Sequence, residues 1–88
     1  MKAVRKQSRK RTFRFTLVLS GVSELSQPVR DALFESGCDD ALLGKRDGKV
    51  FLDFDRKAAS FRDALFSAIS NVESAEIGAQ VVRVEPLD

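Results

Sequence analysis

The sequence of 88 residues contains no histidine, tyrosine or tryptophan, and it has only one cysteine. Histidine is the side chain that most often moves protons near neutral pH, so its absence removes the commonest general acid or base. A single cysteine, Cys38, excludes an internal disulfide and is typical of a reducing compartment. We therefore expect a cytoplasmic protein that is not an enzyme and that needs neither a cofactor nor a metal.

The chain also lacks an apolar run of the roughly 18–20 residues that a membrane-spanning helix needs. Residues 13–19 are rich in apolar side chains, but Arg14 and Thr16 interrupt them at every second position. This alternation indicates a strand, whereas a secretory signal has a continuous apolar core. A transit peptide stays open as an alternative, because the N-terminus is rich in arginine and free of acids.

Acidic side chains are missing from the first fourteen residues, which carry seven basic ones. We regard these seven basic residues as candidate contacts to nucleic acid: Lys2, Arg5, Lys6, Arg9, Lys10, Arg11 and Arg14. The remaining residues carry eight basic and thirteen acidic side chains, which gives that part a net charge of −5. We expect a basic arm over residues 1–12 and one globular domain over residues 13–88. Such an arm can follow the phosphates of a nucleic acid, dock on an acidic protein or membrane, or act only as a solubilising terminus.

Local patterns predict six elements in the order strand, helix, strand, strand, helix, strand. They cover about residues 13–20, 27–36, 41–46, 49–55, 61–72 and 81–85. Ser26 and Ser60 are the expected N-caps of the two helices. Asp47-Gly48 is the strongest hairpin signal in the chain, because both central residues of a type I′ turn need a positive φ.

This order predicts an α+β fold, the ferredoxin-like β-α-β-β-α-β sandwich. Right-handed crossovers place both helices on one face of a four-stranded antiparallel sheet, with the first and third strands at its centre. The open face is expected to present Arg14, Thr16, Val18, Phe51, Asp53, Val81 and Arg83.

Apolar residues in the middle of that open face are candidates for a protein interface. They are Val18, Phe51 and Val81. RNA-recognition sheets stack bases on aromatic residues of both central strands, and here the first strand offers no aromatic on this face. The pattern therefore favours protein contact over base stacking. Sheet-to-sheet dimerisation and a partly covered face both stay open.

Three features could carry chemistry, and each has a plainer interpretation. Asp39 and Asp40 are adjacent, but a hard cation usually needs six or more oxygens, so we expect solvated loop acids. Asp53 and Asp55 share one side of the third strand, where we expect cross-strand pairs with Arg14 and Thr16 of the first strand. Neighbouring acids raise the pKa of a thiol, so Cys38 is interpreted as a half-buried structural residue and not as a nucleophile.

The stretch from Asp31 to Gly48, with the shorter segments Leu52-Asp-Phe-Asp-Arg and Val82-Arg-Val-Glu-Pro, resembles a family of small uncharacterised bacterial proteins. Members commonly carry this domain in front of a helix-turn-helix segment and are regarded as DNA-binding or antitoxin-like regulators. The resemblance implies a regulatory domain and brings no established active site. The helix-turn-helix part is absent from this sequence, so we expect a piece of a longer protein or a stand-alone member that contacts nucleic acid through its arm.

The sequence as a whole predicts a regulatory or interaction domain that self-associates or binds a protein partner, and whose basic arm contacts nucleic acid. One alternative is an antitoxin-type module whose arm docks on an acidic protein partner. Another is a small-molecule sensor that uses the loop around Gly21. We expect no membrane partner.

Overall fold

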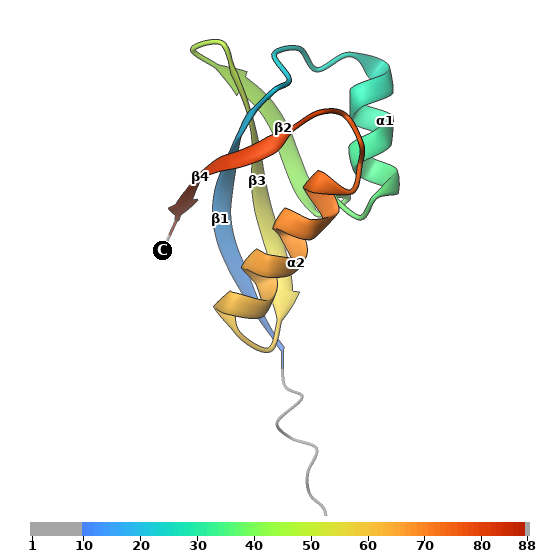
Figure 1. Cartoon of the computed structure of the whole chain (residues 1–88). Helices are drawn as coiled ribbons and strands as arrows, with labels where there is room; N and C mark the ends of the chain where they lie inside the picture. The colour runs from blue at the N-terminus through green and yellow to red at the C-terminus, as the bar shows by residue number, and fades with distance from the viewer. Residues whose placement is uncertain (1–9, 88) are drawn as a thin grey trace, which may run out of the picture.

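The computed structural model describes residues 10–87, which form two helices and four strands (Figure 1). In chain order, the elements are β1 (Arg11–Ser20), α1 (Gln27–Glu35), β2 (Ala41–Arg46), β3 (Lys49–Ala58), α2 (Phe61–Glu73) and β4 (Gln80–Pro86). The predicted order of elements is confirmed. The largest difference in bounds is in β3, which continues to Ala58 instead of ending near Asp55.

The four strands form one antiparallel sheet in the order β2-β3-β1-β4. The strands β1 and β3 are therefore central, as predicted, and β2 and β4 are the edges. Residues 10–87 thus have an α+β fold, with an open four-stranded antiparallel sheet and two helices. Figure 1 shows α2 crossing in front of the sheet and α1 beside it.

The hydrophobic core lies between the helices and one face of the sheet. Alternate residues of the central strands fill it, because successive strand side chains point to opposite faces. The buried strand residues are Phe15, Leu17 and Leu19 of β1 and Val50, Leu52 and Phe54 of β3. The helices add Leu33 from α1 and Ala64, Ala68 and Val72 from α2 to the same cluster. Each large apolar side chain contributes about 1.5–3 kcal/mol when fully buried, so this cluster holds both helices to the sheet.

Both helices begin at the serines that the sequence indicates. The hydroxyl of Ser26 accepts a hydrogen bond from the backbone N–H of Val29 at 3.5 Å, and that of Ser60 accepts one from Asp63 at 3.1 Å. Pro28 lies in the first turn of α1, where its missing N–H breaks no helical hydrogen bond. Neither helix of residues 10–87 is both long and apolar enough to cross a membrane.

The hairpin between β2 and β3 turns at Asp47 and Gly48, which have φ angles of 55° and 77°. Two positive φ angles are what a type I′ turn needs, so the sequence prediction is confirmed. The turn sets Arg46 opposite Lys49 in the ladder. This register directs Phe51 away from the core, on the face that no described helix covers.

Strand β4 differs from the prediction because its register against β1 shifts. Val18 lies opposite Arg83, but the next residue, Leu19, lies opposite Val81. The bulged residue Val82 is 56% exposed, and Val81 packs against the core. The expected position of Val81 on the open face beside Val18 is therefore wrong, since one extra residue in a strand reverses the alternation of its side chains.

Candidate functional site

The predicted nucleic-acid contacts fall partly within the described part of the chain. Lys2, Arg5, Lys6 and Arg9 lie outside the described residues, and Lys10, Arg11 and Arg14 lie within them. Strand β1 begins at Arg11, so Arg11 and Arg14 are held in the sheet by pairing with β3. The basic sequence of the arm therefore continues into a central strand.

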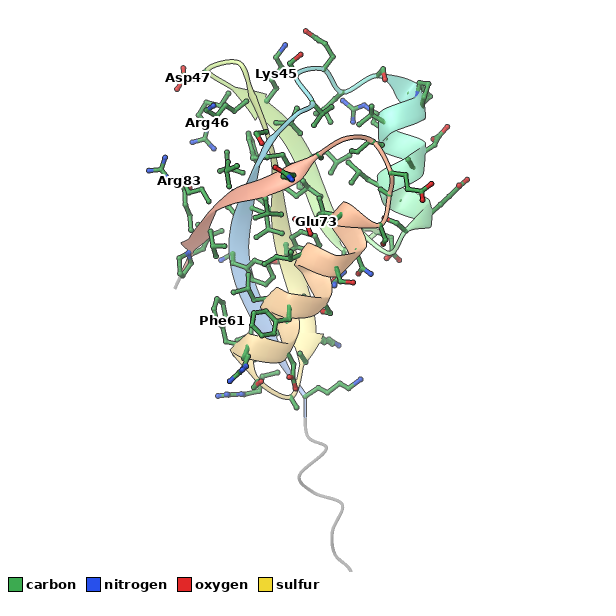
Figure 2. The ribbon with its side chains drawn as sticks, in the orientation of Figure 1. Lys45, Arg46, Asp47, Phe61, Glu73 and Arg83 are labelled. Atoms are coloured by element: carbon green, nitrogen blue, oxygen red, sulfur yellow. The ribbon has the colours of Figure 1, made fainter. Side chains whose placement is uncertain are left out.

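Four exposed basic residues gather at the end of the molecule where β1 begins. We call this set the basic end: Lys10, Arg11, Lys57 and Arg62. In the β1–β3 ladder Arg11 lies opposite Ala58 and Lys57 lies opposite Thr12. Arg62 is in the first turn of α2, directly after Phe61. Figure 2 places Phe61 at the opposite end of the molecule from Asp47, so the basic end is far from the hairpin turn.

Within residues 10–87, none of the four residues of the basic end forms an ion pair. The guanidinium of Arg11 lies 5.1 Å from the centre of the Phe13 ring, and that of Arg62 lies 5.3 Å from the centre of Phe66. An aromatic ring supports a guanidinium without occupying its N–H groups. These donors are therefore available to an anion.

Sequence patterns missed two of the four residues. Lys57 lies on the same face of β3 as Asp53 and Asp55, because alternate residues of a strand share a face. The predicted strand ended near Asp55, so it did not include Lys57. Arg62 is separated from Arg11 by 51 positions in the sequence, and only the packing of α2 against β1 brings the two to the same end. A longer predicted third strand would have found Lys57; no local signal marks Arg62.

Arg14 differs from the basic end because it has an acidic partner. Its Nε lies 3.1 Å from Oδ1 of Asp55, which is the residue opposite on β3. On the same face, the hydroxyl of Thr16 donates a hydrogen bond to Asp53. The predicted cross-strand pairs are thus confirmed, and both aspartates have a structural role. Because Arg14 and Asp55 are exposed, their pair stabilises the fold by only about 0–1 kcal/mol.

A hollow of about 450 Å³ opens beside the basic end, and we call it the aromatic hollow. Its lining residues are Arg11, Thr12, Phe13, Arg14, Phe61 and Pro86. The rings of Phe13 and Phe61 meet edge to face with their centres 6.0 Å apart. Both rings are partly exposed. The hollow therefore joins apolar ring surface to cationic side chains.

The open face carries the remaining predicted interface residues. Val18 lies opposite Phe51, and the Phe51 ring covers Gly44 of β2, where an added Cβ would collide with it. The guanidinium of Arg46 lies 4.7 Å from the centre of the Phe51 ring. A shallow hollow of about 230 Å³ lies between these residues and Arg83 of β4. Val18 and Phe51 are thus together, without Val81.

A buried arginine that the sequence patterns did not indicate links β3 to α2 and to the loop between α1 and β2. Arg56 is only 8% exposed, and it extends the inward-facing row of β3 beyond Phe54. Its Nε and one terminal nitrogen donate to the two carboxylate oxygens of Asp40, each at 2.9 Å. The remaining N–H groups reach Ser67 and Asn71 of α2 and the Gly37 carbonyl. We call these residues the arginine network.

All five N–H groups of Arg56 have an acceptor in this network, so the guanidinium is saturated. The hydrogen bond to Asp40 raises the pKa of Arg56 above its ordinary value. The prediction that Asp39 and Asp40 are both solvated loop acids is therefore wrong for Asp40, since its carboxylate neutralises a buried cation. Asp39 is exposed, as predicted.

Cys38 lies beside the arginine network and is 3% exposed. Burial raises the pKa of its thiol, although the neighbouring Ser36 hydroxyl and the Arg56 charge act in the opposite direction. The thiol is therefore protonated near neutral pH, which makes it a poor nucleophile. The structural role predicted for Cys38 fits this environment, with deeper burial than expected.

Within the described residues, no three side chains of histidine, cysteine, aspartate or glutamate form a group that could hold a metal ion. Comparison with protein-family models, with curated proteins and with solved structures finds no match. The resemblance to helix-turn-helix regulators therefore stays a hypothesis. The candidate binding surfaces of residues 10–87 are the basic end, the aromatic hollow and the open face.

Proposed function

We propose that this protein is a non-enzymatic nucleic-acid-binding module whose contact surface is the basic arm together with the basic end. The observation that supports it most is the position of Lys10, Arg11, Lys57 and Arg62 at the place where the arm joins β1. Three elements contribute to this cluster, and no acid within residues 10–87 pairs with it. A polyanion that binds the arm therefore meets further cations on the folded domain.

Binding by such a surface is driven by the release of counterions from the phosphates. On duplex DNA, each neutralised phosphate adds about −0.9 to the slope of log affinity against log salt concentration. The four residues of the basic end would therefore contribute about 3–4 to the magnitude of that slope. The arm has no aromatic side chain before Phe13, so its own contribution is electrostatic.

Binding to labelled duplex DNA at several salt concentrations tests this proposal. One variant carries Lys10→Gln, Arg11→Gln, Lys57→Gln and Arg62→Gln. The control has the same net charge but carries Arg30→Gln, Lys45→Gln, Lys49→Gln and Arg83→Gln, which lie outside the basic end. We expect the first variant to bind at least about tenfold more weakly at 100 mM salt, with a shallower slope, and the control to bind almost as the natural chain does. Equal losses in both variants would contradict the proposal.

A second function has a specific observation in its favour, namely self-association through the open face. No described helix covers this face, and Val18 and Phe51 lie together beside the hollow of about 230 Å³. Charges of both signs surround them, with Arg83 paired to Glu85 at 3.1 Å. A Val18→Lys variant should lower the apparent mass in sedimentation equilibrium, and an unchanged mass would count against this second function.

We also propose that the fold is ferredoxin-like and that the protein is cytoplasmic. The strand order, the central positions of β1 and β3 and the shared core of both helices support a ferredoxin-like arrangement. The single buried cysteine and the absence of a disulfide within the described residues support a reducing, cytoplasmic location.

A further inference from the structure

The aromatic hollow gives the basic end a feature that phosphate binding alone does not need. A duplex offers charged phosphates on its surface, and its bases are stacked out of reach of side-chain rings. The hollow, by contrast, combines Phe13 and Phe61 with the guanidinium of Arg11 in a space of about 450 Å³. That space is large enough to admit the flat ring of a single nucleobase.

Resting on the proposed nucleic-acid function, we infer that the aromatic hollow binds an unpaired base of single-stranded nucleic acid, while the basic end holds the phosphates on either side of that base. Three observations support this partner. The rings of Phe13 and Phe61 are partly exposed and adjacent. Arg11 belongs to both the hollow and the basic end. Lys57 and Arg62 extend the positive charge from β3 and α2.

The chemistry of each group fits this arrangement. Any nucleobase has an apolar face, so it can pack on aromatic and guanidinium surfaces without reference to its identity. The flanking phosphates can accept hydrogen bonds from the free N–H groups of Arg11, which rests on the Phe13 ring. Arg14 adds a second guanidinium at the rim, although Asp55 already engages its Nε. The site therefore prefers an unpaired strand without reading its sequence.

The open face is a weaker candidate for the same task. Its hollow is about half as large, and its basic residues are accompanied by Asp47 and Glu85 among the lining residues. Arg46 already lies over Phe51, and Arg83 is paired with Glu85. Binding of a strand there is consequently an outcome that the experiment must be able to reveal.

Fluorescence anisotropy with the full-length chain can test the inference on three single-stranded probes of equal length and equal phosphate number, and on a duplex of the same length. The probes are a twelve-nucleotide oligothymidylate, an oligouridylate, a strand of the same length made of abasic sites, and a duplex. Base stacking on an aromatic side chain is worth about 1–3 kcal/mol per base, so we expect each base-carrying single strand to bind at least about fivefold more tightly than the abasic strand. The first two probes distinguish DNA from RNA.

Two leucine substitutions locate the base. Phe61→Leu removes a ring that lines the hollow and keeps an apolar side chain, and Phe34→Leu is the matched control on the exposed side of α1. We expect Phe61→Leu to remove most of the preference for base-carrying strands and to leave abasic binding unchanged, whereas Phe34→Leu preserves the preference. Circular dichroism checks that both variants fold. The comparison of base-carrying with abasic strands uses the natural chain, so it does not depend on the folding of any variant.

The outcomes separate the inference from the function on which it rests. Equal affinity for base-carrying and abasic strands would overturn the base site and leave the phosphate-binding surface standing. A preference that survives Phe61→Leu but is lost in Phe51→Leu would also overturn it, because the base would then lie on the open face. Absence of binding to every probe at 50 mM salt would overturn the proposed function itself.

Discussion

Two arginines of this protein lie over phenylalanine rings at nearly the same distance, yet their surroundings are opposite. Arg11 is exposed with its Cζ 5.1 Å from the centre of Phe13, and Arg56 is buried with its Cζ 4.9 Å from Phe54. All five N–H groups of the Arg56 guanidinium have acceptors, whereas the guanidinium of Arg11 has no hydrogen-bond or ion-pair partner within residues 10–87. A saturated guanidinium stabilises the fold, and one with free donors is available for binding.

The difference arises from what surrounds each strand position. Arg56 faces inward beneath α2, where Gly37 has a φ of 111° and a Cβ at that position would press against Asn71. The chain after α1 can therefore approach α2 closely and supply both the Gly37 carbonyl and Asp40. Arg11 lies at the start of β1, beyond the last residue of β1 that is paired with β4. Its guanidinium rests there on the ring of Phe13.

The largest loss of stability is expected when the buried arginine loses its acidic partner. Asp40→Ala leaves the charge of Arg56 without its bidentate acceptor, and we expect the free energy of unfolding to fall by about 2–4 kcal/mol. Urea denaturation measures this change. Asp39→Ala is the matched control, because Asp39 is exposed and should alter stability by less than about 0.5 kcal/mol. Similar losses in both variants would show that Arg56 does not depend on Asp40.

Lysine substitutions compare the roles of Arg56 and Arg11 directly, since lysine keeps the positive charge but lacks the planar guanidinium and its five donors. In Arg56→Lys several acceptors lose their donors, and we expect a loss of about 1–3 kcal/mol in the free energy of unfolding. The same change at Arg11 should cost less than about 0.5 kcal/mol, because Arg11 is exposed. Thermal unfolding of both variants, followed by circular dichroism, provides the measurement. A larger destabilisation in Arg11→Lys would reverse the assignment of the two roles.

The thiol beside the arginine network should make stability depend on alkaline pH. Because burial raises the pKa of Cys38 in the folded protein, the unfolded chain loses the thiol proton first as pH rises. The stabilising contribution is complete below the unfolded pKa of about 8.5 and is lost as pH rises toward the folded value. We expect the stability of the natural chain, relative to Cys38→Ala, to fall as pH rises above the unfolded pKa of about 8.5. A pH-independent difference in urea denaturation would contradict the raised pKa.

The smallest effect is expected at Arg14, which combines exposure with an acidic partner. Arg14→Gln removes the exposed pair with Asp55, and the free energy of unfolding should change by no more than about 1 kcal/mol. Its effect on nucleic-acid affinity should also be weaker than that of Arg11→Gln, because Asp55 already compensates its charge. Parallel anisotropy titrations compare the two variants. A stronger effect of Arg14→Gln would place the binding surface nearer the open face.

The sequence predicts those parts of the fold that depend on local chemistry. The two serine caps, the Asp47-Gly48 turn and the alternation in β1 each act within a few residues, and all are confirmed. The bulge that turns Val81 inward depends on how β4 pairs with β1, which no local pattern records.

The candidate site was less accessible to sequence reasoning for the same reason. The basic character of the N-terminus is local and visible, but Arg62 and the arginine network come from contacts between distant elements. The pairing of Asp40 with Arg56 needed β3 to continue beyond Asp55 and α2 to cover it. Tertiary packing, rather than any motif, decides which arginine is free.

The proposed position of the binding site is tested most directly by the change in backbone amide chemical shifts when the natural chain binds a twelve-nucleotide single strand. If free guanidinium groups and ring surface define the site, the largest changes should fall at residues 10–13 and 57–62. Residues 37–40 and Arg56 in the arginine network should change little. Changes centred on Val18 and Phe51, with the basic end unaffected, would contradict the account.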